Sequence, residues 1–222
     1  MRVRPSEIQS WTRSRADLLS PAVVRNYVTV LRSMFGTAQL DGLIARPMIL
    51  TQAGLGLRVS ELRALRVEDV DLLRRVVHVT AQLHKLTAER VPLKTANSRR
   101  DVPLPAMVAD VLASHIKPGQ PGLIFIRTAT GHWGNAVLGK KYREAAEAAG
   151  LPRGTTSHDL RHHYASILLD AGESVHTVAA RIGDSPEMVL RVYGHIMPDR
   201  EDTTRRAVDA AWHLTSAVRQ RG

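Results

Sequence analysis

The sequence predicts an α+β fold that is mainly helical and holds one small antiparallel sheet. Apolar residues recur at three- and four-residue steps along most of the chain, as on the buried face of a helix. Strand-like alternation with β-branched residues is concentrated in residues 76–104. The chain has 222 residues, of which 44% are hydrophobic and 23% charged. It therefore has enough apolar material for a core and is not a disordered chain.

Two helices are expected at the start of the chain. The first is a short helix over residues 6–16. The second is a longer helix over residues 20–38, because Ser20 can cap it and Pro21 suits the first helical position. A glycine and then Pro47 interrupt the apolar periodicity, so the first helical unit ends there.

The second unit begins near Pro47. A helix is expected to end where Gly54 and Gly56 interrupt it, and to resume over residues 59–65. Strands are expected at residues 76–83, 90–93 and 101–104, the last two joined by a polar turn, with a fourth short strand considered at 123–126. Further helices are expected at residues 106–116, 136–149, 158–171, 175–182, 186–192 and 200–218.

The charge of the chain favours a polyanionic partner. The formal net charge is +10, and 17 of the 31 basic residues but only eight of the 21 acidic ones lie in the first hundred residues. Nucleic acid fits such a distribution, and ribosomal and membrane-surface roles stay open. Without cysteine there is no disulfide framework and no Cys-ligated zinc. No apolar stretch approaches the roughly 18 residues of a membrane span, and the N-terminus has no apolar signal core, so we expect a cytoplasmic protein.

Five residues in four separate segments suggest chemistry on a phosphodiester. They are Arg58, Lys94, His158, Arg161 and Tyr193. His158 and Arg161 are three residues apart and share a face of the expected helix. Two guanidinium forks suit the oxygens of a phosphate that gains negative charge. A tyrosine phenol can act as the nucleophile in a cationic pocket, and a lysine on a hairpin can protonate the leaving oxygen.

These segments resemble the tyrosine recombinases, or phage-type integrases. The chain has LGLRVSEL at residues 55–62, KTANSRRDVPL at 94–104, HDLRHHYAS at 158–166, and IGD at 182–184 followed nine residues after its last position by Tyr193. Their order and spacing are similar to those of the family, and the resemblance runs from about residue 18 to about residue 198. It implies a site-specific recombinase that cleaves and rejoins duplex DNA through a 3′-phosphotyrosyl intermediate.

The resemblance also implies a role for each residue. Arg58 and Arg161 clamp the phosphate, His158 handles the proton of the tyrosine, Lys94 protonates the departing 5′-hydroxyl, and Tyr193 is the nucleophile. The phosphotyrosyl bond stores the energy of the cleaved linkage, so no nucleotide cofactor is needed and no metal is expected. The implied partner is duplex DNA, bound by a homo-tetramer, with no membrane partner and no small-molecule substrate.

Asp184 departs from the family, which commonly has histidine or sometimes tryptophan at this position. A carboxylate repels phosphate unless it is protonated or turned toward an arginine. Arg181 or Arg191 is the expected partner. We predict that the rate of strand cleavage suffers more from this departure than the affinity for DNA.

The length of the chain is a second departure. In the family, a motif similar to GLIARP closes a helical core-binding domain, and several dozen residues follow before the first arginine box. Here only residues 48–53 separate Pro47 from Gly54. We therefore divide the chain into a partial, truncated core-binding segment, 1–46, and a catalytic domain, 47–222, that lacks its first helices. The alternative is a shortened, catalytically impaired DNA-binding remnant. A type IB topoisomerase-like enzyme and a helical transcription regulator are further alternatives.

Several neighbours of these residues are expected to have structural roles. Glu61 could pair with Arg58 or cap its helix, and Asp159 suits the first turn of a helix. His162 matches a family position that supports the site. His158 and His162 have a zinc-like spacing but no third ligand in sequence, so zinc is not favoured. The last expected helix either docks onto a neighbouring protomer, as the resemblance implies, or packs on its own domain.

Overall fold

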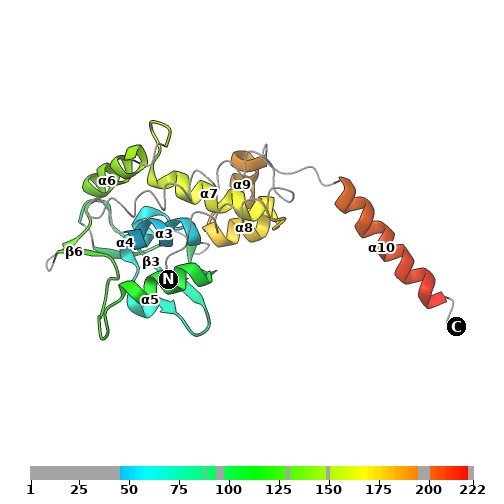
Figure 1. Ribbon diagram of the computed structural model, residues 1–222, viewed down its shortest axis with the longest axis horizontal. Helices are drawn as coiled ribbons and strands as arrows, with labels where there is room; N and C mark the ends of the chain where they lie inside the picture. The colour runs from blue at the N-terminus through cyan, green and yellow to red at the C-terminus, as the bar shows by residue number, and fades with distance from the viewer. Residues whose placement is uncertain are drawn as a thin grey trace.

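The computed structural model describes residues 46–87, 89–93, 98–128, 131–148, 151–194 and 201–219. Within these residues the protein is mainly helical with three small antiparallel sheets (Figure 1), which confirms the predicted α+β class. The helices are α3 (Arg46–Leu55), α4 (Val59–Ala64), α5 (Ala106–His115), α6 (Asn135–Ala148), α7 (Ser157–Asp170), α8 (Val175–Ile182), α9 (Pro186–Tyr193) and α10 (Glu201–Arg219), with a 3₁₀ turn at Val67–Asp69. The strands are β1 (Val70–Asp71), β2 (Val76–Val79), β3 (Ala81–Leu83), β4 (Arg90–Pro92), β5 (Arg100–Pro103), β6 (Ile126–Thr128) and β7 (Gly131–His132).

Helix α3 lies at the centre of the core, packed against α5 and α7. Its residues Met48 and Leu55 are fully buried. The helix ends at Gly56, whose φ is +62°, a left-handed conformation that favours glycine. A Cβ at this position would also lie 2.3 Å from the ring of Tyr164 on α7. Gly56 therefore lets the chain turn into α4 directly beneath α7.

The strands differ from the prediction in one respect. The stretch 76–83 was expected to be a single strand, but it is divided into β2 and β3 at Thr80. β2 lies between β1 and β5, whereas β3 pairs with β4 in a separate hairpin. The Thr80 hydroxyl bonds Asp69 and Arg90 rather than a cross-strand neighbour. The prediction of one sheet was therefore wrong, because these tertiary contacts bend the chain between the two strands.

The expected strand at 123–126 is also placed differently. The strand β6 begins only at Ile126, and Leu123 forms an isolated bridge with Arg66. Ile124 and Phe125 are buried core residues. Their apolar character reflects burial under the α4 turn rather than pairing in a sheet.

Three consecutive helices carry the C-terminal half of the site. Each begins at a capping side chain, supplied by Thr156 for α7, Ser174 for α8 and Ser185 for α9. Helix α8 ends at Gly183, whose φ of +66° is left-handed. A Cβ on Gly183 would lie 2.8 Å from the Arg100 guanidinium, so this glycine permits a close approach between α8 and β5.

Helix α10 lies apart from the other described elements (Figure 1), and its described side chains are exposed. The expected helices at 6–16 and 20–38 lie outside the described residues, as does Lys94. In the described part of the chain, none of the helices combines the length and the apolar character needed to cross a membrane.

Candidate active site

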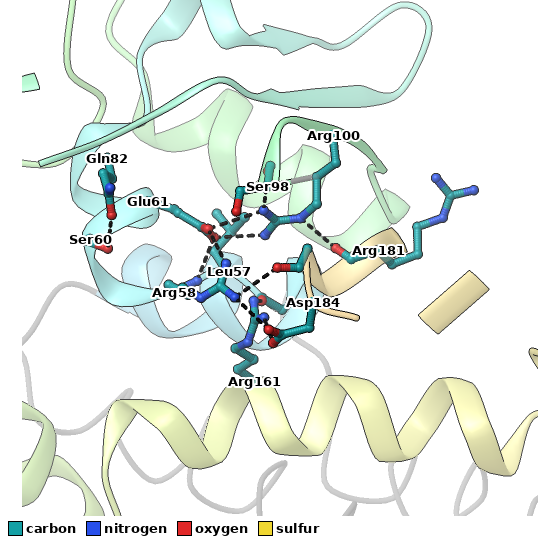
Figure 2. Close-up of polar contacts among 12 residues, drawn as sticks. Leu57, Arg58, Ser60, Glu61, Gln82, Ser98, Arg100, Arg161, Arg181 and Asp184 are labelled. Atoms are coloured by element: carbon teal, nitrogen blue, oxygen red, sulfur yellow. Dashed lines mark hydrogen bonds and ion pairs between the residues drawn. The ribbon is translucent and has the colours of Figure 1, made fainter. Parts of the chain in front are cut away.

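Two arginines from distant segments meet at one carboxylate. Arg58 precedes α4, Arg161 lies in the first half of α7, and Asp184 follows α8. The Nη2 atom of Arg58 lies 3.1 Å from Oδ1 of Asp184, and Nη2 of Arg161 lies 2.8 Å from Oδ2. Figure 2 shows both guanidinium groups turned toward the Asp184 carboxylate. The two arginines predicted to bind phosphate are 103 residues apart in the sequence, and in the structure both bind the same carboxylate.

The partner of Asp184 was predicted incorrectly. Arg181 and Arg191 were expected to take up this carboxylate, but it binds Arg58 and Arg161. Arg181 donates instead to the backbone oxygen of Asp101, and its guanidinium points away from Asp184 in Figure 2. Because Gly183 is left-handed, the chain reverses after α8 and directs residue 184 toward α4 and α7 rather than along its own helix.

Glu61 and Arg100 hold Arg58 in place. Glu61 is 2% exposed, accepts from the backbone nitrogen and Nη1 of Arg58, and caps α4 as one of the predicted alternatives. Its Oε2 also accepts a hydrogen bond from Nη2 of Arg100 at 2.8 Å. Burial alone raises the pKa of Glu61, but its bonds and charge interactions with Arg100 and Arg58 outweigh burial, so the pKa lies below its ordinary value.

Arg100 was not among the site residues predicted from the sequence. Its side chain is 5% exposed, and its Nε donates to the backbone oxygen of Arg181 at 2.8 Å. The signal that could have found it is the position of Arg100 in the strand, where it faces inward beside the alternating residue Val102. Arg100 therefore connects β5, α4 and α8 around the site.

Arg161 is the most buried cation of the cluster. It is 2% exposed and donates from Nη1 to the backbone oxygen of Gly56 at 2.8 Å. Burial and the charge of Arg58 lower its pKa, while Glu61 and Asp184 act in the opposite direction. A guanidinium nevertheless stays protonated at neutral pH. With Arg58 and Arg100 against two carboxylates, the cluster has one positive charge in excess.

Tyr193 lies beside this cluster, held by a histidine. It was expected in a loop after a helix, but it is the last residue of α9 and only 6% exposed. Its hydroxyl lies 2.6 Å from Nδ1 of His162. Burial raises the pKa of the Tyr193 phenol, and the charge of Arg161 acts to lower it. The phenol is therefore fixed between α9 and α7.

His158 reaches the phenol through His162. Their rings are edge-to-face with centroids 4.4 Å apart, and the His162 and Tyr193 rings are 5.6 Å apart. Burial, followed by the charge of His158, lowers the pKa of His162. His162 is therefore neutral at neutral pH, and its Nδ1 can accept the phenolic proton. The sequence pointed to His158 as the proton partner, whereas the direct contact is made by His162.

Comparison with known proteins places the chain in a family. A sequence profile described as the phage integrase family matches residues 27–200, and the chain belongs to this family. The integrase of Staphylococcus phage L54a is 28% identical over 169 residues, covering 68% of this chain and 48% of that protein. Tyrosine recombinase XerC of Mycobacterium leprae is 28% identical over 204 residues, covering 84% of this chain and 63% of that protein. The chain spans about half the length of the first curated relatives it matches.

Solved structures share the fold. The Tn1549 transposon integrase in complex with transposon right end DNA has a TM-score of 0.65 at 21% identity, covering 86% of this chain and 65% of that chain. The XerA recombinase has a TM-score of 0.60 at 17% identity, covering 82% and 62% respectively. These likenesses confirm a fold of the tyrosine recombinase type.

Proposed function

We propose that the chain is a DNA strand transferase that acts as a site-specific recombinase on duplex DNA. The observation that carries this proposal is the convergence of Arg58 and Arg161 on one anion, with the phenol of Tyr193 held nearby. Two arginine forks aimed at one point form a preorganised site for the charge that develops on a phosphodiester under attack.

The proposed reaction is a transesterification. The Tyr193 oxygen attacks the phosphorus, its proton passes to His162 or onward to His158, and the bond from phosphorus to the 5′-oxygen breaks. Lys94 supplies the proton that makes the departing 5′-hydroxyl. Arg58 and Arg161 hold the non-bridging oxygens as negative charge grows on them. The product is a 3′-phosphotyrosyl link, and attack by another 5′-hydroxyl reverses the steps and rejoins the strand.

Asp184 sets a condition on this reaction. In the free protein its carboxylate accepts from the same Nη2 atoms that a phosphate would use. Phosphate and carboxylate cannot share those donors, because two anions at one point repel each other. The proposed cleavage therefore requires the Asp184 side chain to turn away, and this displacement slows the reaction without removing the wider contacts to DNA.

The broader assignments follow the same proposal. We propose that the protein acts in the cytoplasm as a homo-tetramer on duplex DNA, with residues 1–46 as a partial core-binding segment and residues 47–222 as the catalytic domain. The exposed face of α10, which includes Val208 and Trp212, is consistent with docking onto a neighbouring protomer. Most contacts to DNA are expected to be with phosphates, so the affinity should fall steeply with salt.

Trapping of a covalent adduct tests the proposed function. The purified chain is incubated with a pool of nicked duplexes of randomised sequence, in which the nick lets the released fragment diffuse away. An adduct that resists denaturation and is digested to a nucleotidyl peptide containing Tyr193 is the expected result. Tyr193→Phe is the matched control and should form none. Duplex binding with no adduct at any sequence would instead support the DNA-binding remnant, and relaxation of supercoiled plasmid by a monomer would support the topoisomerase-like alternative.

A further inference from the structure

A pocket of about 480 Å³ lies beside the arginine cluster. It is bounded by the start of α4, the β3–β4 hairpin and the first residues of α6 and α7. The residues that line it include Ser60, Lys85, Asn135 and Ser157. We call it the flanking pocket. Figure 2 shows Ser60 and Gln82, two of its wall residues, beside Arg58. Its volume is within the range of a site for a small ligand.

The polar wall of the flanking pocket suits an anion. Among the described residues that line it there is no carboxylate, and Lys85 and Ser157 supply an ammonium and a hydroxyl. The amides of Gln82 and Asn135 donate to the backbone oxygens of Pro92 and Lys85, so an anion would compete for these donors. Asn135 and Ser157 are the first residues of α6 and α7, whose positive dipole ends therefore face this region. The opposite wall is apolar and includes Val59, Leu83 and Val91. A ligand with an anionic side and an apolar side would use both walls.

A buried cation behind this wall has no carboxylate partner among the described residues. Arg63 on α4 is 2% exposed, and among the described residues no carboxylate forms an ion pair with it. Its Nη1 donates to Oδ1 of Asn135, while its Nε has no hydrogen-bond partner in the described part of the chain. Burial lowers the pKa of Arg63. An isolated buried charge is unfavourable. An anion bound in the pocket next to Asn135 would therefore offset the positive charge of Arg63.

We propose that the flanking pocket binds a deoxyribose–phosphate unit of the DNA strand next to the cleaved linkage, with the phosphate on the Lys85–Asn135 side and the sugar on the apolar side. This inference rests on the proposed function, because its ligand is the same DNA. Two of its wall residues, Val59 and Ser60, directly follow Arg58 in the chain. A strand whose scissile phosphate lies at Arg58 can therefore reach the pocket. Arg63 is a positioning residue that orients Asn135 and supplies the charge behind it.

Asn135→Asp separates this role from a purely structural one. The substitution keeps the shape of the side chain, gives Arg63 a carboxylate partner and places a negative charge in the pocket wall. It should raise the melting temperature and lower the affinity for duplex DNA. A structural role of the Arg63–Asn135 bond alone would raise the melting temperature and leave the affinity unchanged. Ser114→Asp on α5 is the matched control, because it adds the same charge at an exposed position outside the pocket.

The measurement is duplex affinity by fluorescence anisotropy, with a 30-base-pair probe over a series of KCl concentrations. Relative to Ser114→Asp, we expect Asn135→Asp to bind about tenfold more weakly, as for a like charge set against a phosphate. Lys85→Ala should lower the slope of log affinity against log salt by about 0.9, the value for one lost phosphate contact. Lys85 is exposed on a turn, so this second variant tests the pocket even where Asn135→Asp folds poorly.

The outcomes separate the two proposals. One outcome is a wild-type chain that binds duplex and forms the Tyr193 adduct, with unchanged affinity and salt slope in both variants. This outcome would overturn the flanking pocket and leave the proposed function intact. A wild-type chain that binds no duplex would overturn both. Weaker binding in both variants, with adduct formation retained at saturating DNA, would support the pocket as a binding site distinct from the chemistry.

Discussion

Replacing Asp184 with asparagine tests how the free protein holds its two arginines. Asp184→Asn keeps the size of the side chain and removes the negative charge between Arg58 and Arg161. The cluster then gains one unit of positive charge, and its guanidinium donors are no longer bound by an internal anion. We therefore expect tighter binding of phosphate and, with DNA, faster formation of the covalent adduct.

The size of the effect follows from the exposure of the two ion pairs. The side chains of Asp184 and Arg58 are 30% and 32% exposed, so water screens that pair and it contributes only about 0–1 kcal/mol. Arg161 is 2% exposed on its side chain, so its pair lies nearer the range of about 1.5–3 kcal/mol for hydrogen bonds to charged groups. Together the two pairs give about 1.5–4 kcal/mol, which corresponds to a factor of about 10–900 in phosphate affinity.

The assay uses inorganic phosphate, so it does not depend on the unknown DNA site. Isothermal titration gives the affinity, and the shift of the melting temperature with phosphate gives a second measure of the same binding. Without phosphate, Asp184→Asn should be less stable than the wild type by about 1–3 kcal/mol, because Arg161 loses its carboxylate. Asp110→Asn on α5 is the control, since it removes the same charge at an exposed position.

Equal phosphate affinity in Asp184→Asn, Asp110→Asn and the wild type would refute this reasoning. It would mean that the Asp184 carboxylate does not compete for the guanidinium donors. Asp184→His is the companion variant for the rate. Adduct formation that is no faster in Asp184→His than in the wild type would refute the prediction that this position limits cleavage.

Three further changes and one pH profile test the surroundings of the site. Glu61→Gln should lower the free energy of unfolding by about 3–5 kcal/mol, because it leaves the buried Arg100 without its carboxylate; a loss below 1 kcal/mol in urea denaturation would contradict the role given to Glu61. Gly183→Ala should destabilise the fold by about 1–3 kcal/mol, because it forces a left-handed backbone and a clash with Arg100; unchanged adduct formation and stability would show that the approach of α8 is not needed. Tyr193→Phe should cost only about 1 kcal/mol of stability, since it removes one hydrogen bond, while it abolishes the adduct; a residual adduct would place the nucleophile elsewhere. Burial lowers the pKa of His163 to about 4 from 6.5, so the unfolded chain takes up a proton first as the pH falls. The contribution of His163 to the free energy of unfolding is therefore fully present above pH 6.5 and should decrease by about 3 kcal/mol toward pH 4. An acid-unfolding profile that is identical in His163→Leu would contradict this.

Much of the helical fold could be predicted from local signals. The predicted bounds of α8 coincide with the observed helix, because Ser174 caps its start and Gly183 ends it in a left-handed conformation. The approach of Arg58 to Arg161 was implied by the order of the family motifs. It is achieved physically by Gly56, which turns the chain from α3 beneath α7.

What could not be predicted depends on tertiary contacts. The break at Thr80 follows from its bonds to Asp69 and Arg90, which lie outside both strands of the broken stretch. The partner of Asp184 depends on the direction in which the chain leaves α8, and no pattern along the chain records that direction. Local charge suggested Arg181, but its side chain binds the neighbouring strand instead.

The surroundings of Tyr193 could not be predicted from the sequence either. Its spacing from the IGD motif predicts that it is the nucleophile, but this spacing says nothing about its environment. The apolar face of α9, with Val189 fully buried, draws the end of the helix onto α7 and encloses the phenol beside His162. A sequence that favours a helix up to residue 192 does not reveal whether the next residue leaves the helix or completes it.

The central claim is that Arg58 and Arg161 hold the phosphate that Tyr193 attacks. A structure of the Tyr193→Phe variant bound to duplex DNA tests it most directly, because that variant keeps the substrate uncleaved. We expect one backbone phosphate between the two guanidinium groups, with the Asp184 carboxylate turned away and the ring of residue 193 facing the phosphorus. DNA bound with Asp184 still bridging the two arginines, and every phosphate out of their reach, would contradict it.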